Sequence, residues 1–194
     1  MPETELTELV RSSPWLMTVL AAVRASNLPD AWTGAGVLRN LVWDERFGKG
    51  FDPTGVRDVD VAFFDPTDLT RDRDRTATES LTAHLPGVPW EATNQAAVHT
   101  WYPAHFGTEP IPPLRGTAEA IATWPETATS VAVRLNPAGE LEVCAPHGLA
   151  DLLGGVWRRN PRQITVERSR ERLTRHAPTT RWPGVRVIAP EDPQ

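Results

Sequence analysis

The 194-residue sequence predicts an α/β (α+β) fold, in which helices flank a mixed β-sheet. Two observations predict it. Segments with a helical spacing of apolar residues alternate along the chain with short segments in which apolar and polar residues alternate, as they do in strands. Two of the strand segments also flank a turn sequence typical of a β-hairpin, at residues 136–139. Strands joined both by helices and by a hairpin indicate a mixed sheet.

Two helices are expected ahead of the first long strand. The hydroxyl and proline residues at 12–14 are typical of a helix start, and apolar residues recur on one helical face from there to the stop sequence at 27–30. A glycine-rich turn at 33–36 precedes the second helix, whose apolar residues lie at 37–42. Residues 48–55 are expected to form a loop.

The clearest strand is expected at residues 58–65. Successive side chains of a strand point to opposite faces. Val59 and Val61 therefore share one face, and Asp58 and Asp60 share the other.

The remaining elements follow from the same reasoning. In order, we expect a helix that begins in the charged segment 67–75 and ends at 85–87, a strand at 88–95, a proline-rich ordered loop at 103–116, a short helix at 117–124, hairpin strands at 130–135 and 140–144, a short helix at 148–153 and an arginine-rich helix within 161–176. Glu167 and Glu171 are interspersed among the arginines of the last helix, which is typical of a solvated helix. A surface for an anionic acceptor is the alternative interpretation of these arginines.

The length of the chain suits one domain. We expect residues 1–194 to form it, with a core at about 15–155 and a helical or irregular C-terminal extension at about 156–194. Several of the eight tryptophans bracket the polar motifs described below, where we expect them to wall a pocket and fill the core: Trp32, Trp43, Trp90 and Trp101.

Composition excludes several classes of protein. Residues are 40% hydrophobic and 23% charged, which suits a globular protein. The formal net charge of −5 argues against nucleic acid as a partner, although a small anionic ligand remains compatible with it. The single cysteine, Cys144, excludes an intrachain disulfide and a thiolate-rich zinc site. An acidic N-terminus and the lack of a long apolar run favour a cytoplasmic protein without a membrane partner.

Asp58 and Asp60 are candidate metal ligands. Two residues apart on a strand, their carboxylates project from one face, about 6.6 Å apart at the backbone. A neighbouring strand lies only about 4.8 Å away and can supply a third carboxylate, for which Glu91 is the candidate. Hard oxygen ligands favour Mg²⁺ or Mn²⁺, with phosphate oxygens in the remaining positions. The alternative is that both aspartates lie on the solvent face of a strand.

Gly34 and Gly36 are candidate phosphate-binding residues. Glycines let the backbone approach a ligand closely, and a helix N-terminus offers free N–H groups to a phosphate. Arg39, one turn into the helix, can donate to a phosphate with two nitrogens, or it can be an ordinary solvated arginine. Asn94, Gln95 and His99 follow Glu91 and are expected to border the same pocket, with His99 in a structural role.

The order of these motifs resembles the DNA polymerase β-like nucleotidyltransferase superfamily. The resemblance covers about residues 15–182. Four longer segments resemble a bacterial branch of the superfamily: Gly34 to Asp44, Asp58 to Asp65, Trp90 to His99 and Ala145 to Leu152. It implies a mixed sheet flanked by helices, Asp58 and Asp60 as metal ligands, and Gly34 and Gly36 beside a triphosphate. Glu91 matches the third carboxylate by position, and Ala35 stands where the superfamily often has Gly or Ser in its first motif.

The sequence therefore predicts an enzyme. We expect a nucleotidyltransferase that uses Mg²⁺ or Mn²⁺ to move a nucleoside monophosphate from an NTP to a small-molecule or protein acceptor. Asp58, Asp60 and Glu91 would be the catalytic and metal-binding residues, with Gly34, Gly36 and Arg39 on the nucleotide. The alternatives are a catalytically inactive nucleotide-binding or protein-interaction module on the same fold, and a metal-dependent phosphohydrolase.

Overall fold

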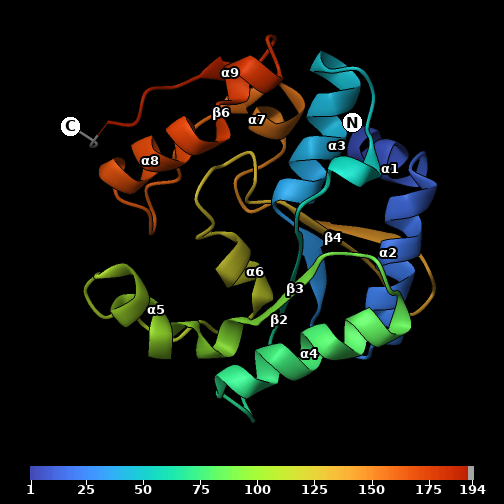
Figure 1. The fold of residues 1–194 in the computed structure, drawn as a ribbon, viewed down its shortest axis with the longest axis vertical. Helices are drawn as coiled ribbons and strands as arrows, with labels where there is room; N and C mark the ends of the chain where they lie inside the picture. Colours follow the sequence, from blue (N-terminus) through green and yellow to red (C-terminus); the bar gives the residue numbers. More distant parts are fainter. Residues whose placement is uncertain (192–194) are drawn as a thin grey trace.

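The computed structural model describes residues 1–191, and its centre is a mixed five-stranded sheet within that range (Figure 1). The strand order is β3-β2-β1-β4-β5. Only the β2–β3 pair is parallel in this sheet, and the other neighbours are antiparallel. The expectation of a mixed sheet is confirmed. The strands are β1 (Trp32–Gly34), β2 (Val59–Phe63), β3 (Trp90–Asn94), β4 (Ala132–Leu135) and β5 (Leu141–Cys144).

Helices lie on both sides of the sheet and at its ends (Figure 1). The α-helices are α1 (Pro2–Arg11), α2 (Pro14–Ala25), α3 (Gly36–Phe47), α4 (Arg71–His84), α5 (Val98–Phe106), α6 (Thr117–Ile121), α7 (Ala150–Leu153), α8 (Val166–His176) and α9 (Pro178–Arg181). Short 3-10 turns occur at η1 (Pro53–Gly55) and η2 (Gln95–Ala97). The Ser13 hydroxyl accepts a hydrogen bond from the N–H of Leu16 at the start of α2, as its position before Pro14 predicts.

One face of the sheet carries the main hydrophobic core. Val59, Val61 and Phe63 of β2 and Val133 of β4 are at most 1% exposed. α2 contacts β1 and β4, and α4 contacts β3, so these two helices cover this face. The alternation of apolar and polar residues in β2 is what directs the valines into this core.

The opposite face carries the polar residues of β2 and β3. The strand register places a row of Cα partners across all five strands: Glu91, Asp60, Gly34, Ala132 and Cys144. Directly paired residues point to the same face of a sheet. A small second hydrophobic cluster lies on this face, where Ile121 of α6 packs against Ala132 and Trp32. The other part of this row, Gly34, Asp60 and Glu91, belongs to the candidate site.

The sequence-predicted elements are largely confirmed, and the differences include the short helix α9, which was not expected. Helix α1 and strand β1 were not expected, because α1 lies in an acidic segment and β1 has only three residues, one of them glycine. The expected loop at 103–116 is wrong at its start, since α5 continues through Pro103 to Phe106 and ends at Gly107, which adopts a left-handed conformation. The short parallel pair β6 (Val156–Trp157) and β7 (Arg186–Val187) was also not expected.

The C-terminal segment packs on α3 through three tryptophans. The rings of Trp157 and Trp182 lie 6.4 and 5.1 Å from the ring of Trp43, and all three are at most 1% exposed. Leu6 of α1 belongs to the same core cluster. The buried core therefore extends on both sides of the expected range 15–155, and the predicted C-terminal extension contributes to it up to Val185.

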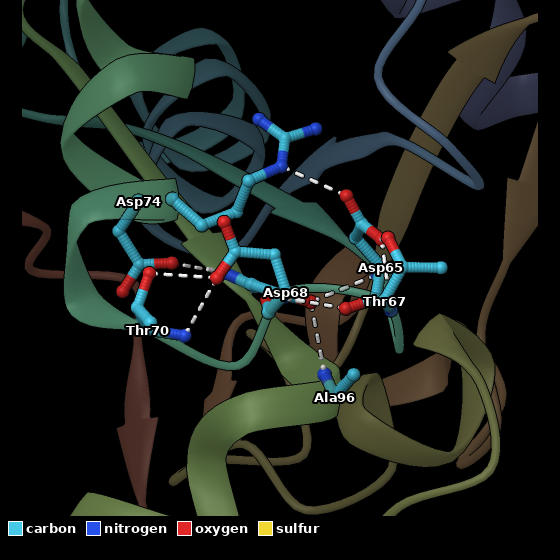
Figure 2. A network of polar contacts seen from close by, with 8 residues as sticks. Asp65, Thr67, Asp68, Thr70, Asp74 and Ala96 are labelled. Atoms are coloured by element: carbon cyan, nitrogen blue, oxygen red, sulfur yellow. Dashed lines mark hydrogen bonds and ion pairs between the residues drawn. The ribbon is translucent and has the colours of Figure 1, made fainter.

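A network of polar contacts joins the C-terminal ends of β2 and β3 (Figure 2). Its residues lie at or just after the ends of these strands and at the start of α4. The fully buried Asn94 donates to the carbonyls of Asp65 and Asp68 and accepts from the N–H groups of Asp65 and Ala96. Asp74 of α4 accepts from the N–H of Asn94 at 2.6 Å. This network fixes the register of the two strands that carry Asp60 and Glu91.

Of the helices in the described residues, none combines the length and the apolar character that a membrane crossing needs.

Candidate active site

Three carboxylates lie near one another on the polar face of the sheet. Asp60 lies within β2, between its Cα partners Gly34 on β1 and Glu91 on β3. Asp58 immediately precedes β2 and is exposed, as is Glu91, whereas Asp60 is partly buried. The structure thus brings together the three acidic residues that the sequence singled out.

The electrostatics of this group are unfavourable for three negative charges. The pKa of Asp60 is raised to about 7 by burial, with further contributions from the negative charges of Asp58 and Glu91. The positive charges of Arg172 and Arg39 act in the opposite direction and do not outweigh these effects. In the folded protein an additional positive charge at this point would be stabilising.

Within the described residues, these three carboxylates have no hydrogen-bond or ion-pair partner from the protein. Other carboxylates that are buried or partly buried are paired, among them Glu126 with Arg172, Asp74 with Arg71 and Asp151 with Arg158. Carboxylates that are left unpaired by the protein are the kind of group that a divalent cation occupies.

The three side chains do not form a ready-made cage. No three His, Cys, Asp or Glu side chains of residues 1–191 converge closely enough to hold a metal ion by themselves. The donor set nevertheless fits Mg²⁺ or Mn²⁺, which prefer carboxylate oxygens and in enzymes commonly complete their coordination with water and substrate phosphates.

The N-terminus of α3 faces these carboxylates. A Cβ atom added to Gly36 would stand 3.6 Å from Asp58 Oδ1 and 3.8 Å from a terminal guanidinium nitrogen of Arg39. Ala35, just before the helix, has a φ of 54° and a ψ of −120°, a backbone conformation that L-residues rarely adopt. Strain of this kind is common at functional sites, and here it turns the start of α3 toward Asp58.

Glycine occupies position 34 for a different reason than position 36. It lies in β1, not in a loop, and a Cβ atom there would stand 2.3 Å from the carbonyl oxygen of Val131 and 2.7 Å from Cβ of Ala132. The close approach of β4 therefore requires glycine at this position irrespective of any ligand.

Arg39 is buried, and no carboxylate of residues 1–191 makes an ion pair with it. It is 5% exposed, so the interpretation as a solvated helix arginine is wrong. Its Nε and one terminal nitrogen donate to Asn40 Oδ1, and its guanidinium lies 5.6 Å from the ring of Trp157 and 5.3 Å from that of Trp182. Burial, with smaller contributions from neighbouring charges, lowers its pKa to about 10, so the group remains charged at neutral pH.

The structure adds Arg172 of α8 to the site. Its guanidinium donates to both oxygens of Glu126, at 2.7 and 2.9 Å, and Glu126 is completely buried. Burial opposes the charge of Arg172, but the hydrogen bonds and charge of Glu126 outweigh it and raise the pKa of Arg172. Its charge also acts on Asp60. The interpretation of the whole arginine-rich segment as a solvated helix is wrong for this residue, and its partner, 46 residues away, gave no sequence signal.

The other polar residues expected near the pocket divide into different roles. Asn94 is part of the strand-joining network, and Gln95 donates to the carbonyl of Thr93. The ring of His99 is partly buried, and its Nδ1 has no hydrogen-bond partner among residues 1–191. Asp44 of α3 does not pair locally but accepts from Trp182 Nε1 at 2.6 Å and from Arg181 at 3.0 Å, which anchors the C-terminal segment.

Several solved structures are similar to this chain in fold. A solved structure described as a "CCA-adding enzyme head domain" is similar to this chain, with a TM-score of 0.78, 27% identity and 95% of both chains covered. A Thermotoga maritima CCA-adding enzyme complexed with tRNA (TM-score 0.56) and a CCA-adding enzyme with ATP (TM-score 0.52) are each 15% identical and share the fold. Both matches include 94% of this chain. The chain spans only 42% and 43% of the length of those two enzymes.

A search of curated proteins finds no match. The family model described as "Nucleotidyltransferase" matches residues 21–187, which contain β1 to β7 and all the candidate site residues. The chain belongs to this nucleotidyltransferase family.

Proposed function

We propose that the protein is a divalent-metal-dependent nucleotidyltransferase that moves a nucleoside monophosphate from an NTP to a hydroxyl group of a small-molecule or protein acceptor. The observation that carries the proposal is the placement of Asp58 and Asp60. Within residues 1–191 neither carboxylate has a hydrogen-bond or ion-pair partner. Asp58 faces the glycine N-terminus of α3, and the charge of the buried Arg39 acts on Asp60.

The N-terminal end of α3 and Arg39 are proposed to hold the triphosphate. Free N–H groups at a helix N-terminus attract phosphate oxygens, and the absence of a side chain at Gly36 leaves room for them beside Asp58. Within residues 1–191 no carboxylate makes an ion pair with Arg39, although the charges of Glu126 and Asp58 act on it, and a buried guanidinium binds phosphate strongly. Glycine at position 34 is required by β4, so its part in phosphate binding is limited to its backbone.

Asp58 and Asp60, with Glu91 as the third carboxylate, are proposed to hold the metal. When bound, Mg²⁺ or Mn²⁺ neutralises charge that develops on the transferring phosphoryl group. In the reaction, a bond forms between the acceptor oxygen and the α-phosphorus of the NTP, and the bond from that phosphorus to the β-phosphate bridging oxygen breaks. Pyrophosphate leaves with that electron pair, and the hydroxyl proton passes to Asp60 or Glu91.

The acceptor is proposed to be a small molecule or a protein. The net charge of −5 is opposite to what non-specific nucleic-acid binding needs. One structural neighbour is complexed with tRNA, so tRNA belongs in the acceptor panel as the competing outcome.

The experiment is incubation with each α-³²P-labelled NTP and Mg²⁺, with the protein alone and with panels of small hydroxyl compounds, proteins and tRNA. We expect label on a small molecule or protein together with release of pyrophosphate. Label on tRNA would overturn the acceptor assignment. Release of inorganic phosphate with water alone would identify a phosphohydrolase. Thermal stabilisation by Mg²⁺·NTP without turnover would identify an inactive nucleotide-binding module.

A further inference from the structure

Helix α5 carries a cluster of aromatic side chains that has no role in the proposed function. Four neighbouring rings contact one another: Trp101, Tyr102, His105 and Phe106, with centroid separations from 4.4 Å (Tyr102–Phe106) to 6.4 Å (Trp101–Phe106). Tyr102 and Phe106 are four residues apart and therefore share one face of the helix. Both rings are partly exposed, so the cluster is not simply a part of the hydrophobic core.

Helix α8 connects this cluster to the carboxylates. The guanidinium of Arg168 lies 4.0 Å from the ring centroid of Phe106. One turn later, Arg172 interacts electrostatically with both Tyr102 and Asp60. A further turn on, His176 lies close enough to Arg39 and Arg172 to feel the charge of each. These positions recur every four residues and define one face of α8.

Unpaired polar atoms gather on the same two helices. Nine buried side-chain nitrogen or oxygen atoms of the described residues lack a hydrogen-bond partner, and six of them belong to α5, α8 or the residues directly after α5: His99 Nδ1, Trp101 Nε1, Thr108 Oγ1, Arg168 Nε, Ser169 Oγ and His176 Nε2. Ser169 is completely buried. Each unpaired buried group destabilises the fold, and a ligand or water with complementary groups would remove that cost.

We propose that Tyr102 and Phe106 of α5, together with Arg168 of α8, form the surface on which the base of the bound NTP stacks. This inference rests on the proposed function. Flat aromatic rings beside an arginine are a surface on which any nucleobase can stack.

The order of groups along α8 favours the base as the occupant. The eight residues from Arg168 to His176 rise about 12 Å along the helix. Arg39 and the ring of His176 both pack against Trp157, at 5.6 and 5.4 Å, so terminal phosphates at Arg39 would lie toward this end of α8. With the α-phosphate at the carboxylates, the nucleoside would extend toward Arg168 and Phe106.

The test compares binding of an NTP with binding of inorganic triphosphate, both in the presence of Mg²⁺, by titration calorimetry. The variant is Tyr102→Leu/Phe106→Leu, which keeps apolar side chains but removes the stacking rings. We expect it to lose about tenfold or more in NTP affinity while its affinity for inorganic triphosphate stays unchanged. A second variant, Arg39→Met, is expected to weaken binding of both ligands.

Protein fluorescence gives a readout independent of activity. Because Trp101 contacts both Tyr102 and Phe106, NTP should quench emission that inorganic triphosphate leaves unchanged, and a Trp101→Phe variant should lose that difference. Unfolding of the Leu double variant at a temperature close to that of the original protein shows that the effect is local.

Different failures have different meanings. Equal NTP affinity of the Leu double variant and the original protein would overturn the stacking surface, as would a raised KM for the acceptor alone. Equal binding of NTP and inorganic triphosphate by the original protein would overturn it too, and none of these three results would overturn the proposed nucleotidyl transfer. Failure of the original protein to bind either ligand would overturn the proposed function and this inference together.

Discussion

Gly36 and Asp58 face each other so closely that a methyl group at position 36 would lie 3.6 Å from Asp58 Oδ1. That distance is an ordinary van der Waals contact, so the protein can accommodate alanine there. The space between the start of α3 and the carboxylates is therefore not required for packing. In the proposed function this space is where phosphate oxygens of the NTP bind.

Substitution of the two glycines should separate their roles. Gly36→Ala is expected to keep the free energy of unfolding within about 1 kcal/mol, because its φ is not in the left-handed region. It should weaken NTP binding about tenfold or more, because the methyl group occupies the phosphate space. Gly34→Ala is expected to destabilise the protein by about 3 kcal/mol or more, since its methyl group would overlap the backbone of β4. Urea unfolding and NTP titration of both variants check this, and a reversed pattern would contradict it.

Removing the charge of Asp60 should stabilise the protein without metal and abolish its response to metal. Burial and the charges of Asp58 and Glu91 make the ionised form of Asp60 unfavourable, as its raised pKa of about 7 indicates. Asp60→Asn is therefore expected to raise the melting temperature in EDTA and to lose the stabilisation that Mg²⁺ gives the original protein. Asp72→Asn on the exposed part of α4 is the matched control and should change neither quantity. An Mg²⁺ response that survives in Asp60→Asn would exclude this residue as a ligand.

The ion pair between Arg172 and Glu126 should be essential for stability. Arg172→Met leaves the completely buried Glu126 without a positive partner and is expected to cost about 3–5 kcal/mol. The double variant Glu126→Gln/Arg172→Met should recover part of that loss, because no buried charge then remains. Arg158→Met, which breaks a more exposed pair with Asp151, is expected to cost less than about 1 kcal/mol. Similar losses in both single variants would refute the distinction.

His176 should make the stability of the protein depend on pH. Burial and the positive charges of Arg39 and Arg172 lower its pKa to about 4, with Arg175 adding to the effect and Glu126 opposing it. Between pH 6.5 and about 4 the unfolded chain binds a proton at this residue and the folded protein does not, so stability falls as the pH falls.

The size of this effect is about 2 kcal/mol across that interval, because the ring is only half-buried and solvent screens part of it. His176→Gln should have a flatter stability profile than the original protein from pH 6.5 to 4, measured by urea unfolding. His84→Gln, on the exposed end of α4, should keep the original slope. Identical slopes for all three proteins would show that folding does not lower the pKa of His176.

The sequence was informative where chemistry and periodicity are local. Asp58 and Asp60 were placed on one side of a strand by alternation alone, and the parallel register then set Glu91 beside Asp60. The network around Asn94, which fixes that register, depends on contacts between residues 20 to 29 positions apart and had no local pattern.

Long-range contacts account for what the sequence did not predict. In the sequence, Arg39 and Arg172 have the pattern of solvated helix residues. In the fold, Arg39 is buried against Trp157 and Trp182. Arg172 forms an ion pair with the distant Glu126. The sequence did not predict strand β1, because glycine at position 34 is typical of a turn. In the structure this glycine allows β1 and β4 to pack closely. Burial of this kind depends on the assembled fold.

The most direct test of the central claim is a crystal structure with Mg²⁺ and a non-hydrolysable NTP analogue. We predict metal ions bound by oxygens of Asp58 and Asp60, with triphosphate oxygens at the N-terminus of α3 and within hydrogen-bonding distance of Arg39. An analogue bound elsewhere, or metal ions that contact neither aspartate, would contradict the account.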